Sequence, residues 1–137
     1  MSVARFTLAY WCVLVAALLP IVCAGIAKWG TFSAPAREGG FDNGNPRAWL
    51  ARQTDWRARA NAAQANSFEA LPFFIGAVVI AHQLGAYQAR LDLLAVVYVV
   101  LRLLYITLYV TNKASVRSLV WTLALVTNVA ILFSGYH

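Results

Sequence analysis

The chain has 137 residues, of which 61% are hydrophobic and 12% are charged, and its mean hydropathy is +0.65. A soluble domain is typically about 45–50% apolar and about 25% charged, so the composition indicates a membrane protein, long enough for one domain. The net charge of +6 does not indicate nucleic-acid binding, because the basic residues fall mostly in the gaps between apolar segments.

Four apolar segments predict four membrane-spanning helices, at about residues 6–27, 68–87, 91–111 and 116–136. Each is close to the ~20 residues that a helix needs to cross ~30 Å of hydrocarbon. The apolar runs do not alternate with polar residues, so we expect helices rather than the strands of a barrel. The first run exceeds the ~7–15 apolar residues of a signal peptide, so we expect no cleaved leader.

The polar connection after the first segment is expected to contain the start of the second helix. Its stretch "EGGFDNGNP" predicts a turn, and Asn45 followed by Pro46 is typical of a helix N-cap and first helical position. Nothing breaks a helical pattern from Trp49 to Pro72. We therefore expect one long helix over residues 47–87, whose first part lies outside the membrane. The two later connections are short, which predicts antiparallel neighbours.

The basic residues of the connections predict the orientation in the membrane. On one side lie Lys28, Arg37, Arg47, Arg52, Arg57, Arg59, Lys113 and Arg117, and on the other only Arg5 and Arg90. The first and third connections should therefore be cytoplasmic and both termini outside. The excess of Arg over Lys, together with abundant Ala, favours a bacterial source and hence the bacterial inner membrane.

Two polar stripes interrupt the apolar pattern, because positions three, four and seven apart share a helix face. On the second helix the stripe consists of Arg59, Asn66 and Glu69, with Gln64 displaced to one side. On the third helix it consists of Tyr98, Arg102, Tyr105 and Tyr109.

Arg102 lies near the middle of the third apolar segment, where an arginine costs ~2.5–3.5 kcal/mol on insertion scales. One explanation is a structural ion pair between Arg102 and Glu69. The other is a polar pocket, open to the cytoplasmic side and lined by both stripes. The three tyrosines on the Arg102 face favour the pocket, because an ion pair does not need three hydroxyl groups.

Other polar residues have simpler interpretations. Cys12 and Cys23 share one apolar segment, so a straight helix cannot join them in a disulfide, and no Cys/His spacing indicates a metal site. We expect His82 to pack between helices or at the membrane interface, Asn128 to make an interhelical contact, and Asp92 to serve a helix N-terminus.

The stripes and their surroundings resemble one family. The stretches "RANAAQANSFEALPFF", "LRLLYITLY" and "ASVRS", in this order, resemble the MAPEG family, the membrane-associated proteins in eicosanoid and glutathione metabolism. The matching positions are Asn66, Glu69, Pro72 and Phe73 on the second helix, Arg102, Tyr105 and Tyr109 on the third, and Arg117 after it. The chain resembles a bacterial-type member of this family, similar to the microsomal glutathione transferases.

The resemblance implies one all-α domain over residues 1–137, an integral membrane four-helix bundle assembled as a homotrimer. It implies glutathione as co-substrate, bound between subunits near the cytoplasmic face, and a transferase or peroxidase acting on hydrophobic electrophiles from the membrane lipid. Gln64, Asn66 and Glu69 would hold the backbone and amino group of glutathione. Tyr105, Tyr109 and Arg102 would contact its carboxylates and peptide. Arg59, about one turn before Ala62, would supply a further cation for glutathione and partly replace the arginine that related synthases carry at that position. Arg117 would stabilise the thiolate.

Two positions depart from the family pattern. The eicosanoid synthases carry Arg and Tyr where this chain has Ala62 and Ala70, so leukotriene or prostaglandin synthesis is not supported. The alternative is a non-catalytic member that binds a lipid or a partner protein. A small multidrug transporter is disfavoured, because such transporters carry an essential Glu in the first helix, where this chain has no charge.

Overall fold

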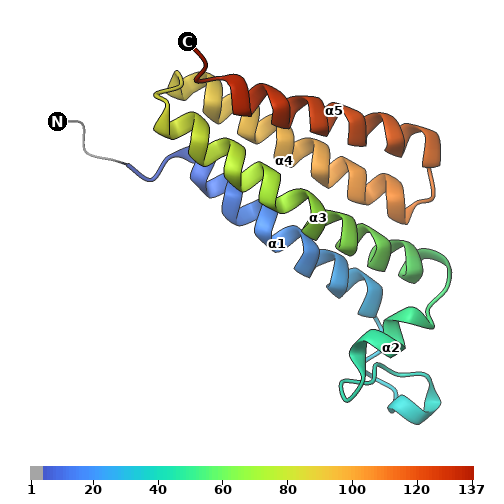
Figure 1. The fold of residues 1–137 in the computed structure, drawn as a ribbon. Helices are drawn as coiled ribbons and strands as arrows, with labels where there is room; N and C mark the ends of the chain where they lie inside the picture. Colours follow the sequence, from blue (N-terminus) through green and yellow to red (C-terminus); the bar gives the residue numbers. More distant parts are fainter. Residues whose placement is uncertain (1–4) are drawn as a thin grey trace.

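A computed structural model describes residues 5–137, and within this range the fold is entirely helical (Figure 1). The long helices are α1 (Leu8–Lys28), α3 (Asp55–Gln83), α4 (Gln88–Val110) and α5 (Ala114–Phe133). A 3₁₀ turn, η1 (Ala36–Glu38), and the short helix α2 (Pro46–Ala51) lie in the connection between α1 and α3. All four long helices are long and apolar enough to cross a membrane, which confirms the predicted all-α, four-span fold.

The four long helices run side by side, with α3 and α4 in the middle. α1 packs against α3 and α4, and α5 packs against the same two helices. The start of α1 and the end of α5 lie at one end of the bundle, while α2 and the tight α4–α5 turn lie at the other (Figure 1). Consecutive long helices are therefore antiparallel, as the short α3–α4 and α4–α5 connections predict for the last three of them.

Small side chains bring the helices close together. The contacts among the long helices include a set of buried alanines: Ala9, Ala16, Ala77, Ala81, Ala95 and Ala124. Small residues at such contacts let helix backbones approach closely in a membrane. Many large apolar side chains point outward, and Leu14, Ile21 and Val100 are 45%, 62% and 56% exposed. The outer faces of the bundle therefore suit lipid or another apolar surface.

Two polar residues hold the end of the bundle where α1 begins. Asp92 on α4 accepts a hydrogen bond from the backbone N–H of Ala9 (3.0 Å) and another from the Gln88 side chain (2.7 Å). A carboxylate at a helix N-terminus is favourable, so the predicted role of Asp92 is confirmed. His82 on α3 packs against Tyr10 on α1, with ring centroids 5.1 Å apart, as expected of an interhelical histidine.

The expectation of one continuous helix over residues 47–87 is wrong. α2 ends at Ala51, Thr54 is extended, and Asp55 begins α3 with a φ of 54°. The break turns α2 back so that Trp49 packs against Phe41, with ring centroids 5.1 Å apart, and Trp49 is only 3% exposed. Burying the indole favours the break, because a large aromatic side chain gains more from burial than a few helical hydrogen bonds contribute.

Candidate functional site

Arg102 is buried in the middle of the bundle and pairs with neutral groups. It is 3% exposed, and its Nη2 donates a 2.7 Å hydrogen bond to Asn66 Oδ1 and makes a longer 3.5 Å contact with Ser67 Oγ, both on α3. Within residues 5–137 the hydrogen bonds of Arg102 therefore go to an amide and a hydroxyl, and the ion pair with Glu69 is not formed. The positive charge of Arg102 remains without a carboxylate in contact.

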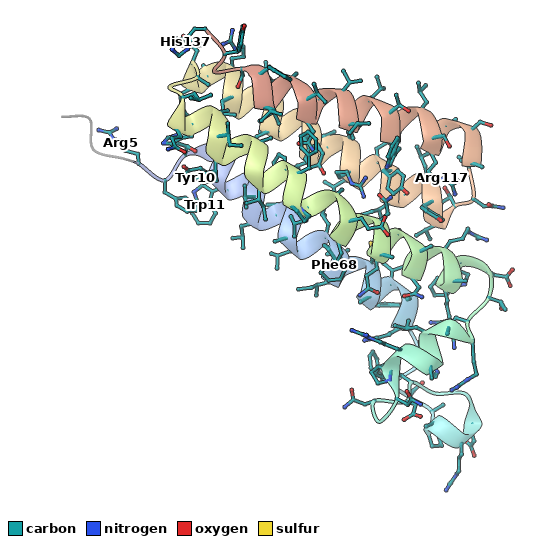
Figure 2. The ribbon with its side chains drawn as sticks, viewed as in Figure 1. Arg5, Tyr10, Trp11, Phe68, Arg117 and His137 are labelled. Atoms are coloured by element: carbon teal, nitrogen blue, oxygen red, sulfur yellow. The ribbon has the colours of Figure 1, made fainter. Side chains whose placement is uncertain are left out.

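A second arginine lies at the start of α5, near the α4–α5 turn (Figure 2). The guanidinium carbon of Arg117 lies 4.2 Å from the centre of the Tyr109 ring. Tyr109 in turn meets Tyr105 edge to face at 5.7 Å, and Arg102 lies 4.4 Å from the Tyr105 ring centre. The two cations are thus joined by two tyrosines, and each cation–π contact helps to fix a guanidinium in place.

Two neighbouring cavities open beside these residues. The inner cavity, of about 190 Å³, lies among α3, α4 and α5, and its polar lining residues are Asn66, Glu69, Tyr98, Arg102 and Asn128. The outer cavity, of about 370 Å³, lies nearer the α4–α5 turn and is lined by Asn66, Tyr105, Tyr109, Arg117, Ser118, Trp121 and Thr122. The cavities share Asn66 and Trp121, so they adjoin each other. Residues of both polar stripes thus line neighbouring cavities, although Arg59 and Gln64 line neither of them.

Glu69 and Asn66 share a helix face and both line the inner cavity, but they differ in exposure and in their contact with Arg102. Asn66 is half-buried and contacts Arg102, whereas Glu69 is exposed and lines the inner cavity. The carboxylate therefore lies at the accessible side of a site whose interior carries a cation. Such an arrangement can bind a ligand that has both an anionic and a cationic group.

Two sequence-predicted site residues lie apart from these cavities. The Nε of Arg59 donates to the carbonyl of Val110 (3.0 Å), so this arginine caps the end of α4. Gln64 lines neither cavity, and its Oε1 is buried without a hydrogen-bond partner in the described part of the chain. The structure thus brings together Asn66, Glu69, Arg102, Tyr105, Tyr109 and Arg117.

Sequence reasoning missed the supporting residues of the site. Ser67, which is 4% exposed, contacts Arg102, and it follows the core spacing of Ala60, Ala63 and Phe74 along α3. Phe74 stacks on Tyr98 with ring centroids 4.2 Å apart and an angle of 15° between the planes. These contacts join residues far apart in the sequence, so only the helical period of Ser67 could have indicated its place.

The described residues contain no group of three His, Cys, Asp or Glu side chains placed to hold a metal ion. Both cysteines are buried thiols on α1. The polar groups that line the two cavities are arginine, tyrosine, amide, hydroxyl, indole and carboxylate side chains.

A family model described as the MAPEG family matches residues 8–136, nearly the whole chain. The chain belongs to the MAPEG family. Together with the four apolar spans, this makes the protein an integral membrane protein. Neither the curated proteins nor the solved structures gave a significant match. MAPEG members include both glutathione transferases and proteins without catalytic activity. The function of this chain therefore has to be argued from the residues of its site.

Proposed function

We propose that this MAPEG protein is a membrane-bound glutathione-dependent transferase or peroxidase for hydrophobic electrophiles. The observation that carries the proposal is the pair of arginines, Arg102 and Arg117, that face adjoining cavities together with Tyr105 and Tyr109. Arg102 makes its hydrogen bonds to neutral side chains, so its charge attracts an anionic ligand.

The charges of the site match those of glutathione. Glutathione carries two carboxylates, one ammonium group and one thiol. Arg102 and the tyrosine hydroxyls suit the carboxylates and the peptide, and the exposed Glu69 suits the ammonium group. Asn66 lines both cavities and can bond to the peptide backbone of the ligand.

Arg117 is suited to activate the thiol. A thiol with a pKa of about 8.5 is only about 3% ionised at pH 7, and lowering that pKa by about 2 units would ionise about three quarters of it. A neighbouring cation shifts a pKa by about this amount. Tyr109 holds the Arg117 guanidinium beside the outer cavity, so the cation is in place before the ligand binds.

The reaction follows from the thiolate. In conjugation the sulfur lone pair forms a bond to the electrophilic carbon, and the leaving group departs with its bonding electrons. In peroxide reduction the thiolate forms a bond to one peroxide oxygen as the O–O bond breaks. The alkoxide takes up a proton and leaves as the alcohol, and the sulfur becomes a sulfenic acid. A second glutathione thiol then attacks this sulfur, which gives the disulfide and water. The cavity rim includes the exposed side chains of Phe73, Trp121 and Leu125, so an apolar substrate can enter from the lipid.

The assembly and orientation belong to the same proposal. A homotrimer would place a neighbouring subunit over part of the broad apolar surface of the helices. The basic connection between α1 and α3 lies at the same end of the bundle as Arg117 (Figure 2). With this end in the cytoplasm of a bacterial cell and both termini outside, the site would face the cytoplasmic supply of glutathione.

One observation favours a second candidate, a non-catalytic MAPEG protein that binds a lipid or a partner protein. Ala70 lines the inner cavity at a position where the related synthases carry Tyr, and Ala62 replaces their Arg. Arg59 does not replace the missing arginine at Ala62 within the chain, because its guanidinium donates a hydrogen bond to the carbonyl of Val110. We therefore expect a lower affinity for glutathione than in those synthases.

The test is a glutathione titration of the detergent-purified protein, followed by the ultraviolet signal of the thiolate. We expect saturable binding with a thiolate signal in the wild type, and binding without that signal in Arg117→Gln. Arg37→Gln is the matched control, because Arg37 is an exposed arginine in η1, outside both cavities. Absence of binding at millimolar glutathione would refute the transferase and leave the non-catalytic alternative.

A further inference from the structure

The inner cavity has a polar floor and an apolar rim. Three floor residues are each 3% exposed: Tyr98, Arg102 and Asn128. Three rim residues are 40% or 41% exposed: Phe73, Trp121 and Leu125. The rim side chains come from α3 and α5, so the cavity opens sideways between these helices, toward the apolar surroundings of the bundle.

Asn128 has an unused hydrogen-bonding group at this floor. Its Oδ1 is buried and accepts no hydrogen bond from any residue that the structure describes. The Asn128 side chain is within hydrogen-bonding reach of the Tyr98 hydroxyl. Its Oδ1, buried without a donor, is open to a further donor from a bound ligand. Tyr98 lies beside it and is held by its stacking on Phe74, with ring centroids 4.2 Å apart. The floor is therefore rigid on the side of the tyrosine.

The inner end of the cavity is distinct from the place proposed for the thiol. Tyr105, Tyr109 and Arg117 line the outer cavity, whereas Tyr98 and Asn128 line the inner one. Asn128 follows Arg117 on α5 by 11 residues, which corresponds to a rise of about 16 Å along the helix. A group bound at Asn128 would thus lie deeper in the membrane than the reacting sulfur.

We infer that the inner end of the cavity binds a compact aromatic group that carries a hydrogen-bond donor, such as a phenol or an aniline, with the donor on Asn128 Oδ1. The inner cavity has a volume of about 190 Å³, and an apolar cavity of about 150 Å³ engineered in another protein binds benzene. Within it, Phe73 and Tyr98 lie about one helical turn beyond Glu69 and Arg102, which are proposed to hold glutathione, so the ring takes the inner end only. Trp121, Phe73 and Tyr98 supply aromatic walls.

The inference also names a substrate class, and in that respect it rests on the proposed transferase. The preferred electrophile would be elongated, with a phenolic ring at one end and the reactive carbon at the other. The ring would occupy the inner end of the cavity, and the reactive carbon would reach the thiolate beside Arg117. As a statement about a binding site, the inference does not depend on glutathione.

The first experiment measures binding without glutathione. 4-Fluorophenol is titrated into the purified protein in lipid nanodiscs and followed by fluorine NMR, beside 4-fluorotoluene, in which a methyl group replaces the hydroxyl. We expect saturable binding of the phenol, weakened about tenfold in Asn128→Leu, a substitution that keeps the branching at Cγ and removes the acceptor. The toluene should bind both proteins equally. Thr127→Val is the matched control, because Thr127 bonds to its own helix at Leu123 and does not line the cavity.

Equal binding of the two probes by the wild type would overturn the inference, as would unchanged phenol binding in Asn128→Leu. Should Asn128→Leu fail to fold, Leu125→Trp replaces it, because Leu125 lies at the exposed rim and a larger side chain there narrows the mouth. Both probes should then bind more weakly, and full retention would refute the site. The protein could also bind the phenol through Asn128 and fail to bind glutathione. That result would refute the proposed transferase and support this binding site.

Discussion

Asn66→Ala is expected to destabilise the protein through Arg102. Asn66 Oδ1 accepts the 2.7 Å hydrogen bond of a guanidinium that is 3% exposed, and the remaining 3.5 Å contact with Ser67 is too long to replace it. A hydrogen bond to a charged group contributes about 1.5–3 kcal/mol, and a buried donor left without a partner costs as much. The substitution should therefore lower the free energy of unfolding by about 1.5–3 kcal/mol, measured by titration with a denaturing detergent in mixed micelles.

The physical reason can be separated from a general loss of packing by a double-mutant cycle. Arg102→Met removes the charge with a side chain of comparable length, so Asn66→Ala in that background should cost only about 0.5 kcal/mol. Asn61→Ala, earlier on the same helix and half-buried, is the control for the loss of an amide. Equal costs of Asn66→Ala in both backgrounds would refute the reasoning, because the hydrogen bond with Arg102 would then contribute nothing.

Three further substitutions test other parts of the structure. Arg117→Lys keeps the charge but loses the planar guanidinium over Tyr109, so part of the glutathione thiolate signal should remain. A signal as low as that of Arg117→Gln would contradict this reasoning. Ala70→Tyr adds a hydroxyl at the wall of the inner cavity and should raise the affinity for glutathione about fivefold, measured by calorimetry. A lower affinity would mean that the new tyrosine ring occupies the space of the ligand. Trp49→Ala empties a buried contact and should speed proteolysis of the connection between α1 and α3 without changing glutathione binding.

The sequence predicted the membrane-spanning part well because hydropathy and helical period act locally. Residues three, four and seven apart share a helix face, which was enough to place Arg102, Tyr105 and Tyr109 on one surface of α4. Their meeting with Asn66 and Arg117 followed from the family resemblance and the short connections. The structure contains all of these residues around two adjoining cavities.

What the sequence could not predict depends on contacts between distant segments. Asn66 and Glu69 lie on the same face of α3, so spacing alone could not choose which of them would contact Arg102. The place of Arg59 depends on where α4 ends relative to the start of α3. The break before α3 depends on Trp49 finding Phe41 across the connection, and a helical pattern contains no information about that partner.

The neutral partners of Arg102 have a consequence for ligand binding. An ion pair with Glu69 would have lowered the cost of placing the arginine in the membrane, about 2.5–3.5 kcal/mol on insertion scales, and would also have cancelled its charge. Asn66 and Ser67 satisfy a guanidinium donor while leaving the charge intact. The carboxylate of Glu69 is exposed and lies at the accessible side of the cavity, apart from the guanidinium of Arg102. The chain thus tolerates a buried cation, and its stability should rise when an anionic ligand occupies the site, since binding to the folded state alone stabilises that state.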